Sequence, residues 1–258
     1  MAWVLDLDGV IWLGDQPLAG AAEAVARLRA TGERVLFATN NSSVEVAGTE
    51  AKLASFGVRA EGDVVTSAMA TARLVEPGER VLVAGGPGLV EALAARGATV
   101  LDSRSYEPSG AGDVDAVAVG FHYHFDYDGL RRAAAAIWQG ARFLASNDDA
   151  TYPTPAGVIP GGGAIVASIA FAVGQQPVIA GKPHEPMAAL IHELSGDPAG
   201  AGTMVGDRPD TDGAFAKTLG YRFALVLSGV TRAGDLPVDP TPDVVADDLA
   251  ALVESELN

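Results

Sequence analysis

Short apolar runs alternate with alanine-rich amphipathic stretches along most of the chain. WVLDLD at residues 3–8 and RVLFATN at 34–40 begin with the β-branched and aromatic content of buried strands. Residues 19–32 and 43–57 carry apolar side chains at helical spacing, and each stretch ends at a glycine. Strands that alternate with helices predict parallel strands joined by helical crossovers.

The same alternation restarts near residue 80 and again near residue 178. The chain therefore holds more strands than one compact sheet usually contains. We expect two α/β domains, with the outer blocks, residues 1–67 and 178–258, closing into one sheet and residues 68–177 forming an insertion.

The composition fits a soluble globular protein, and the net charge argues against some classes of binding partner. Of 258 residues, 48% are apolar and 19% are charged, and the formal net charge is −16. Such acidity repels nucleic acids and anionic membranes, and the longest basic stretch is Arg131-Arg132. We therefore predict no nucleic-acid partner and no membrane partner. There is no cysteine and no recognisable secretion signal, so we expect a cytoplasmic protein.

Polar side chains follow four of the predicted core strands. They are Asp6 and Asp8, then Thr39 and Asn40, then Lys182, and finally Asp207 and Asp212. Ligands of open α/β sheets bind beyond the carboxyl ends of the strands, so these groups are expected to meet there. Side chains two apart in an extended chain point the same way, so Asp6 and Asp8 face one pocket, and Gly9 permits a sharp turn after them.

These residue types suit chemistry at a phosphate. A phosphate monoester is a dianion that repels an attacking carboxylate, and a lysine with a divalent cation cancels that repulsion. Carboxylates are ligands that Mg²⁺ prefers. The alternative is that the two N-terminal aspartates lie on a solvated loop or cap a helix.

The four segments DLDGV (6–10), TNN (39–41), GKP (181–183) and GDRPDTD (206–212) match, in order, the motifs of the haloacid dehalogenase superfamily. The sequence resembles this superfamily over nearly its whole length. It is most similar to the NagD-like and para-nitrophenylphosphatase subgroup, which carries a large α/β cap between the second and third motifs. The resemblance implies a Rossmann-like parallel-sheet core, residues 1–67 and 178–258, with the cap at 68–177.

The resemblance also implies roles for the motif residues. Asp6 would be the nucleophile that forms a phospho-aspartate, and Asp8 the acid and base. Mg²⁺ would be held by Asp6, the backbone carbonyl of Asp8, and Asp207, while Asp212 would orient a ligand water or Lys182.

The phosphoryl oxygens would be held by Thr39, Asn40 and Lys182. Outside the motifs, His122 and His124 alternate along a predicted strand and are candidates for substrate or metal contacts, or for an ordinary strand rim. His184 is either at the rim of the site or an ordinary polar loop residue.

We predict a Mg²⁺-dependent phosphomonoesterase that hydrolyses small phosphorylated metabolites, with sugar, polyol or short-chain phosphates favoured, because a cap excludes large substrates. Alternatives are a nucleotide monophosphate or pyridoxal phosphate phosphatase, and transfer of the phosphoryl group to an acceptor other than water. A phospho-acceptor signalling domain and a catalytically silent protein that binds phospho-ligands are alternatives of another class. Relatives often dimerise through the cap, and the resemblance implies a homodimer of that kind.

Overall fold

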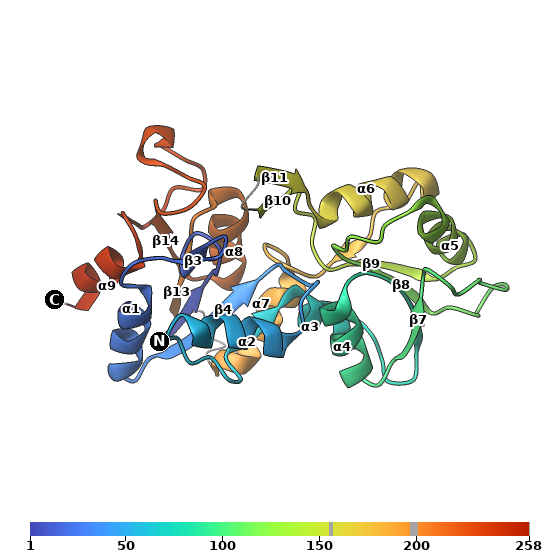
Figure 1. The fold of residues 1–258 in the computed structure, drawn as a ribbon, viewed down its shortest axis with the longest axis horizontal. Coiled ribbons are helices and arrows are strands. Elements are labelled where there is room, and N and C mark those ends of the chain that lie inside the picture. Colours follow the sequence, from blue (N-terminus) through green and yellow to red (C-terminus); the bar gives the residue numbers. More distant parts are fainter. Residues whose placement is uncertain (155–156, 197–200, 258) are drawn as a thin grey trace. The chain divides into compact units, whose positions relative to one another are not determined.

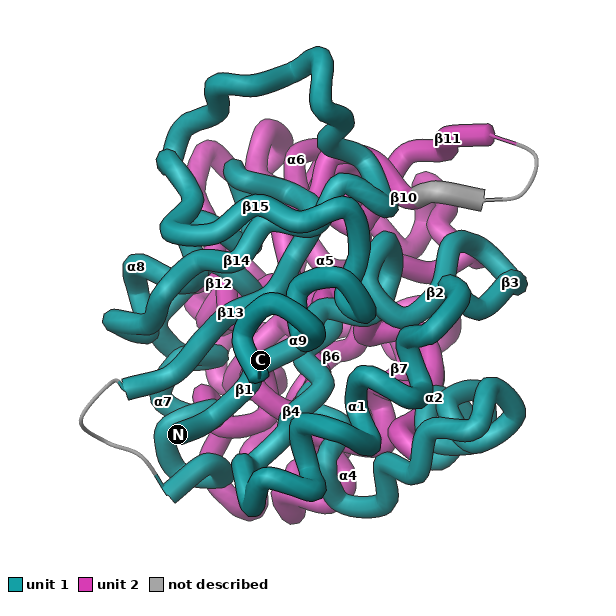
Figure 2. Tube along the Cα trace, turned by 90° about the vertical axis from the view of Figure 1, so that its left-hand side faces the viewer, with its two compact units in different colours: residues 1–39, 47–65, 182–258 teal, residues 40–46, 66–181 magenta. Residues whose placement is uncertain are grey.

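The computed structural model describes residues 1–154, 157–196 and 201–257. Contacts divide the chain into two compact units, which Figure 2 shows in different colours. Unit 1 comprises residues 1–39, 47–65 and 182–258, and unit 2 comprises 40–46 and 66–181. Each unit contains its own parallel sheet flanked by helices, which confirms the predicted α/β class.

Unit 1 is built on a six-stranded sheet in the order β15-β14-β13-β1-β4-β5. The strands are β1 (Ala2–Leu5), β4 (Arg34–Thr39), β5 (Val64–Thr66), β13 (Gly202–Gly206), β14 (Arg222–Val226) and β15 (Val244–Ala246). β1 pairs in parallel with β13 on one side and β4 on the other. All four residues of β1 are buried, as expected for a strand covered on both faces.

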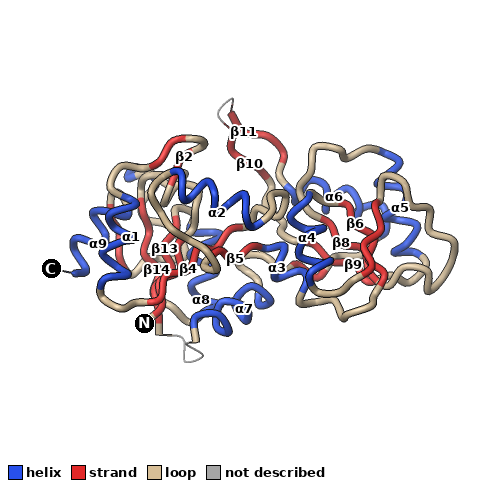
Figure 3. Tube along the Cα trace, turned by 60° about the horizontal axis from the view of Figure 1, so that its bottom comes forward, coloured by secondary structure: helices blue, strands red, loops and turns tan. Residues whose placement is uncertain are grey.

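Helices cover both faces of this sheet (Figures 1 and 3). They are α1 (Ala21–Ala30), α2 (Val46–Ser55), α7 (Glu185–Ser195), α8 (Ala214–Leu219) and α9 (Leu249–Leu257). α1 packs against α9, and α7 packs against α8. The step from β1 to β4 and the step from β13 to β14 run in opposite directions along the sheet, so right-handed crossovers place α1 and α8 on opposite faces.

The second helix begins later than the sequence predicts. The pattern indicates a helix over residues 43–57, but α2 starts at Val46. Asn41 Oδ1 accepts hydrogen bonds from the Ser43 backbone N–H at 2.9 Å and from its hydroxyl at 2.7 Å. This local turn competes with helix formation, so the helix begins three residues further along the chain than the pattern indicates.

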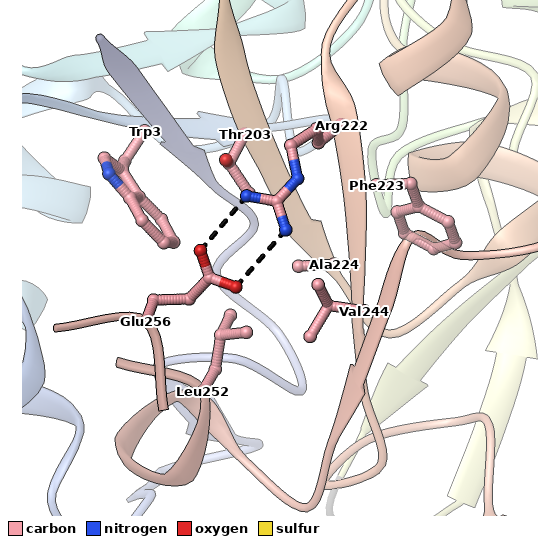
Figure 4. A pocket seen from close by; sticks show the side chains of 8 residues that line it. All are labelled: Trp3, Thr203, Arg222, Phe223, Ala224, Val244, Leu252 and Glu256. Atoms are coloured by element: carbon pink, nitrogen blue, oxygen red, sulfur yellow. Dashed lines mark hydrogen bonds and ion pairs between the residues drawn. The ribbon is translucent and has the colours of Figure 1, made fainter. Parts of the chain in front are cut away.

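The C-terminal helix is fastened to the sheet by an ion pair, drawn in Figure 4. The Arg222 guanidinium contacts the Glu256 carboxylate through two hydrogen bonds of 3.0 and 3.2 Å. Trp3 and Leu252 lie beside the pair, and the space between these side chains has no room for a water-sized group. This region, which includes the starts of β13 and β14, is therefore packed and offers no ligand site.

Two short strands and two helical turns also belong to the described part of unit 1. β2 (Trp12–Leu13) and β3 (Gln16–Pro17) form a small antiparallel pair after β1. η1 (Pro209–Gly213) is a π-helical turn after β13, and η2 (Ala233–Asp235) is a 3₁₀ turn. Among the described residues, no helix combines the length and apolar character needed to cross a lipid bilayer.

Unit 2 contains a five-stranded parallel sheet in the order β12-β9-β8-β6-β7. The strands are β6 (Arg80–Ala84), β7 (Thr99–Asp102), β8 (Ala116–Val119), β9 (Arg142–Ala145) and β12 (Val178–Ile179). A hairpin of β10 (Thr151–Thr154) and β11 (Gly157–Pro160) precedes the last helix of the unit. The predicted insertion, residues 68–177, lies within unit 2, which also takes in residues 40–46, 66–67 and 178–181. The strand expected in the core sheet at residue 178, β12, pairs instead with β9 in the sheet of unit 2.

The helices of unit 2 are α3 (Ser67–Ala72), α4 (Pro87–Ala95), α5 (Tyr127–Trp138) and α6 (Gly162–Val173). Val117 and Val119 of β8 belong to a core cluster with α5 and α6. Ala116 and Ala118 of the same strand belong to a second cluster with α3 and α4. Because successive strand residues face opposite sides, the two helix pairs cover opposite faces of the sheet.

Candidate active site

The carboxyl end of β1 places a carboxylate against a buried lysine. Asp6 follows β1 directly, and its backbone N–H donates to Val205 O at 2.9 Å. The Lys182 side chain is 2% exposed, and its Nζ lies 2.8 Å from Asp6 Oδ1 and 2.8 Å from Asp212 Oδ1. An ammonium held between two carboxylates at this depth is a fixed structural feature, unlike a solvated surface pair.

Asp207 and Asp212 complete the cluster from the segment after β13. One carboxylate oxygen from each of Asp6, Asp207 and Asp212 lies within 4.8 Å of the other two. The Val230 N–H donates to Asp207 Oδ2 at 2.5 Å, and the Arg208 N–H donates to Asp212 Oδ2 at 3.2 Å. These backbone donors fix the direction in which the two carboxylates point.

The cluster carries more negative than positive charge. Burial, and then the charge of Asp6, raises the pKa of Asp207 to about 6. Burial also raises the pKa of Asp212, and the Lys182 ammonium opposes this rise. Burial by itself would lower the pKa of Lys182, but the charges of Asp212 and Asp6 raise it above its usual value. Three carboxylates beside one ammonium therefore favour a further cation, and oxygen ligands at this spacing fit Mg²⁺.

Gly9 allows the chain to turn immediately after the acid pair. Its φ is +80°, a conformation that side chains rarely adopt. A Cβ at this position would lie 2.5 Å from Asp207 Oδ2, so only glycine permits this close approach. The Ser228 hydroxyl donates to Gly9 O at 2.7 Å and fastens the turn. The turn predicted at Gly9 is confirmed.

Asp8 is held by Trp12. The indole Nε1 donates to Asp8 Oδ1 at 2.9 Å, and the Trp12 side chain is 4% exposed. The Lys52 Nζ lies 4.4 Å from the centre of the indole ring. Burial, and then the charge of Asp6, raises the pKa of Asp8 to about 6, against the effect of the Trp12 hydrogen bond. A carboxyl with a pKa near neutrality is suited to both giving and taking a proton.

Thr39 and Asn40 lie at the end of β4. β4 runs parallel to β1 and ends at Thr39, so this buried side chain lies at the edge of the sheet where β1 ends. Asn40 belongs to unit 2, where its Nδ2 donates to Asp149 Oδ1 at 3.2 Å. Its backbone oxygen accepts from Asn147 Nδ2 at 2.8 Å. A phosphate contact of Asn40 stays a prediction.

His122 and His124 lie in a loop, and the prediction that they alternate along a strand is wrong. β8 ends at Val119 because both neighbouring strands, β6 and β9, end opposite that residue. His122 lines a cavity of about 300 Å³ in unit 2 together with Phe121 and Phe125. Burial lowers the pKa of His122, which favours its neutral form. His124 is exposed.

His184 lies elsewhere in the fold, at the position that precedes the first turn of α7 in unit 1. The structure thus places His122 and His124 on one loop of unit 2 and His184 on a helix end of unit 1. Substrate contacts of these three histidines stay predictions.

Two residues of the site escaped the sequence analysis. Trp12 donates a hydrogen bond to Asp8, and the sequence signal of this contact is its position four residues after Asp8. Lys52 lies within the amphipathic pattern of α2, and nothing in that pattern indicates a contact with Trp12.

Family models, curated proteins and solved structures similar to this chain are hydrolases of one family, several of them named as phosphatases. A family model described as haloacid dehalogenase-like hydrolase matches residues 3–99, and one described as HAD-hydrolase-like matches residues 179–252. D-glycerol 3-phosphate phosphatase of Mycobacterium tuberculosis is 36% identical over 96% of this chain and 70% of its own length. An acid sugar phosphatase of Staphylococcus saprophyticus is 33% identical over 93% of this chain and 92% of its own length. A crystal structure of the M. tuberculosis glycerol phosphate phosphatase in complex with magnesium is similar with a TM-score of 0.86 and 35% identity, over 97% of this chain and 75% of that one.

Proposed function

Because this chain belongs to the haloacid dehalogenase-like hydrolases, we propose that it is a Mg²⁺-dependent phosphatase that hydrolyses small phosphorylated metabolites. The observation that carries the proposal is the buried cluster in which Lys182 contacts Asp6 and Asp212, with Asp207 beside them. The two relatives are named for glycerol phosphate and for sugar phosphate, so polyol and sugar phosphates come first among the candidate substrates. Nucleotide monophosphates and pyridoxal phosphate rank behind them.

The carboxylates of Asp6 and Asp207 and the backbone carbonyl of Asp8 are the groups that would hold Mg²⁺. When bound, Mg²⁺ neutralises charge on the phosphoryl group and on the carboxylates around it. A structure of the similar M. tuberculosis phosphatase in complex with magnesium supports magnesium as the metal. Asp212 acts through Lys182, because its carboxylate contacts the ammonium and keeps it beside Asp6.

In the first chemical step, a carboxylate oxygen of Asp6 attacks phosphorus and the bond to the ester oxygen breaks. Asp8 transfers its proton to the leaving oxygen, which departs as an alcohol. In the second step, Asp8 takes a proton from water as that water attacks the phospho-aspartate. The bond between Asp6 and phosphorus breaks, and inorganic phosphate leaves.

Thr39, Asn40 and Lys182 hold the phosphoryl oxygens during both steps. Residues 68–177, which lie within unit 2, act as the cap. His122, His124 and His184 are candidates for contacts with the leaving group. The cytoplasmic location inferred from the sequence stays a prediction.

We also propose that two copies associate through this cap. Residues 150–177 of the cap contain no charged side chain in a chain whose net charge is −16, so contact through this stretch avoids repulsion between acidic copies. Phe171 on α6 is 92% exposed and offers an apolar contact. Sedimentation of the wild type and of Phe171→Asp tests the proposal, and a monomeric wild type contradicts it.

The test of the enzymatic proposal is phosphate release from a panel of small phosphomonoesters, with Mg²⁺ and with a chelator. We expect release that depends on Mg²⁺ and is abolished in Asp6→Asn, because an amide cannot form the acyl phosphate. Substantial release by Asp6→Asn contradicts the nucleophile assignment. Binding of phosphorylated ligands by a folded wild type without any turnover favours the silent binding protein instead.

A further inference from the structure

The loop after β1 folds back so that Trp12 lies next to Asp8. Trp12 N donates to Leu7 O at 3.2 Å, and Gly9 N donates to Trp12 O at 2.7 Å. These two backbone bonds bring the indole against the Asp8 carboxylate, where Nε1 donates to Oδ1 at 2.9 Å. A buried indole N–H needs an acceptor, and here the acceptor is the proposed acid and base of the reaction.

Two further side chains contact the indole ring, one over its face and one at an inclined angle. Lys52 Nζ lies 4.4 Å from the ring centre and also donates to Gly14 O at 2.8 Å, so the cation is itself fixed. Phe56 meets the ring edge-on, with ring centres 5.9 Å apart and planes inclined by 61°. A cation over the ring draws electron density from the indole and makes its N–H a stronger donor.

This arrangement distinguishes the two oxygens of Asp8. The indole N–H is a donor only, so Oδ1 must act as an acceptor whenever the contact is made. A proton on the Asp8 carboxyl is therefore directed to Oδ2. An acid without such a partner carries its proton on either oxygen and in more than one rotamer, and each arrangement has a different geometry toward the leaving group.

We propose that Trp12 is a positioning residue that reserves Oδ1 of Asp8 as an acceptor, so that Oδ2 is the oxygen that transfers the proton. The proposal rests on the role of Asp8 in the proposed function. Lys52 and Phe56 contribute by fixing the plane of the indole.

The kinetic consequence depends on the leaving group. An alkoxide such as that of glycerol is strongly basic and needs a proton in the transition state. 4-Nitrophenolate is weakly basic and can leave without being protonated. kcat/KM reports the steps up to transfer to Asp6, so it isolates the acid role from the later base role. Trp12→Phe removes the N–H but keeps an aromatic ring for Lys52 and Phe56.

We expect Trp12→Phe to lower kcat/KM for glycerol phosphate by about 10- to 100-fold, which is part of the usual contribution of a general acid. We expect a loss of less than about threefold for 4-nitrophenyl phosphate, because this leaving group makes little use of the acid. Trp138→Phe is the matched control, since Trp138 is an exposed tryptophan at the end of α5 in unit 2, and this change should lower kcat/KM for neither substrate. Equal losses on both substrates in a folded Trp12→Phe variant, or no loss on either, overturn the proposal.

A spectroscopic test does not depend on activity. The protein has 3 tryptophans, and the indole ¹H–¹⁵N signal lost in Trp12→Phe identifies Trp12. In metal-free protein, Asp8→Ala should move this signal upfield because its acceptor is gone, and Asp8→Asn should move it less. An unmoved signal in Asp8→Ala overturns the proposal. Failure of the proposed function would show instead as turnover in Asp6→Asn, with the indole signals unaffected.

Discussion

Replacing Asp207 by asparagine should make the metal-free protein more stable at alkaline pH. Asp207 is 3% exposed, and burial with the charge of Asp6 raises its pKa from 3.8 to about 6. Each pKa unit corresponds to about 1.4 kcal/mol, so ionising Asp207 in the fold costs about 3 kcal/mol. Asparagine keeps the shape and still accepts from the Val230 N–H, but it carries no charge.

The pH dependence of this effect has a definite sign. Because the pKa is raised in the fold, the charge of Asp207 destabilises the protein above about pH 6 and has no effect below about pH 4, where the carboxyl is protonated in both states. Urea unfolding in a chelator should therefore give Asp207→Asn an advantage of about 2–3 kcal/mol at pH 8 that disappears near pH 4. Asp210→Asn is the matched control, since Asp210 is an exposed aspartate in the same segment, and it should change little.

Magnesium should remove most or all of the advantage of Asp207→Asn. Saturating Mg²⁺ stabilises only a protein that binds it, by about 2.7 kcal/mol at a concentration 100 times its Kd. The wild type should therefore gain stability, while Asp207→Asn should gain much less. The reasoning is refuted if Asp207→Asn shows no advantage in chelator at pH 8, or if Asp210→Asn shows the same advantage.

Three further results are expected. Lys182→Met should cost about 3–5 kcal/mol in chelator, measured by urea unfolding, because Asp6 loses its buried partner, and Mg²⁺ should restore part of the loss. Asp113→Asn should lower the melting temperature at neutral pH, and the difference should shrink as pH falls toward about 2, because the Ser109 N–H, followed by the Tyr106 hydroxyl, lowers the pKa of Asp113 to about 2. Alanine at His124 should change the ranking of kcat/KM among small phosphates and leave 4-nitrophenyl phosphate hydrolysis in place; unchanged kinetics on every substrate would remove His124 from the site.

The sheet and the polar ends of its strands were predictable because they rest on short-range pattern and topology. A buried run such as Ala2–Leu5 indicates a strand by composition, and parallel strands bring their carboxyl ends to one edge. Asp6 and Asp207 were therefore placed together without any knowledge of side-chain directions. The prediction about His122 was wrong because the end of a strand depends on where its neighbours end, which a local pattern does not record.

The contact between Trp12 and Asp8 belongs to a class that periodicity cannot indicate. It depends on two backbone hydrogen bonds in the turn around Gly9, and these follow from the turn geometry rather than from apolar spacing. The same turn brings Gly9 against Asp207 and gathers negative charge that the fold does not neutralise by itself. A chain selected for stability alone would have no reason to keep three carboxylates around one ammonium. The cluster is understandable if a cation and a phosphate complete it, because the groups that destabilise the free protein are then the groups that bind both.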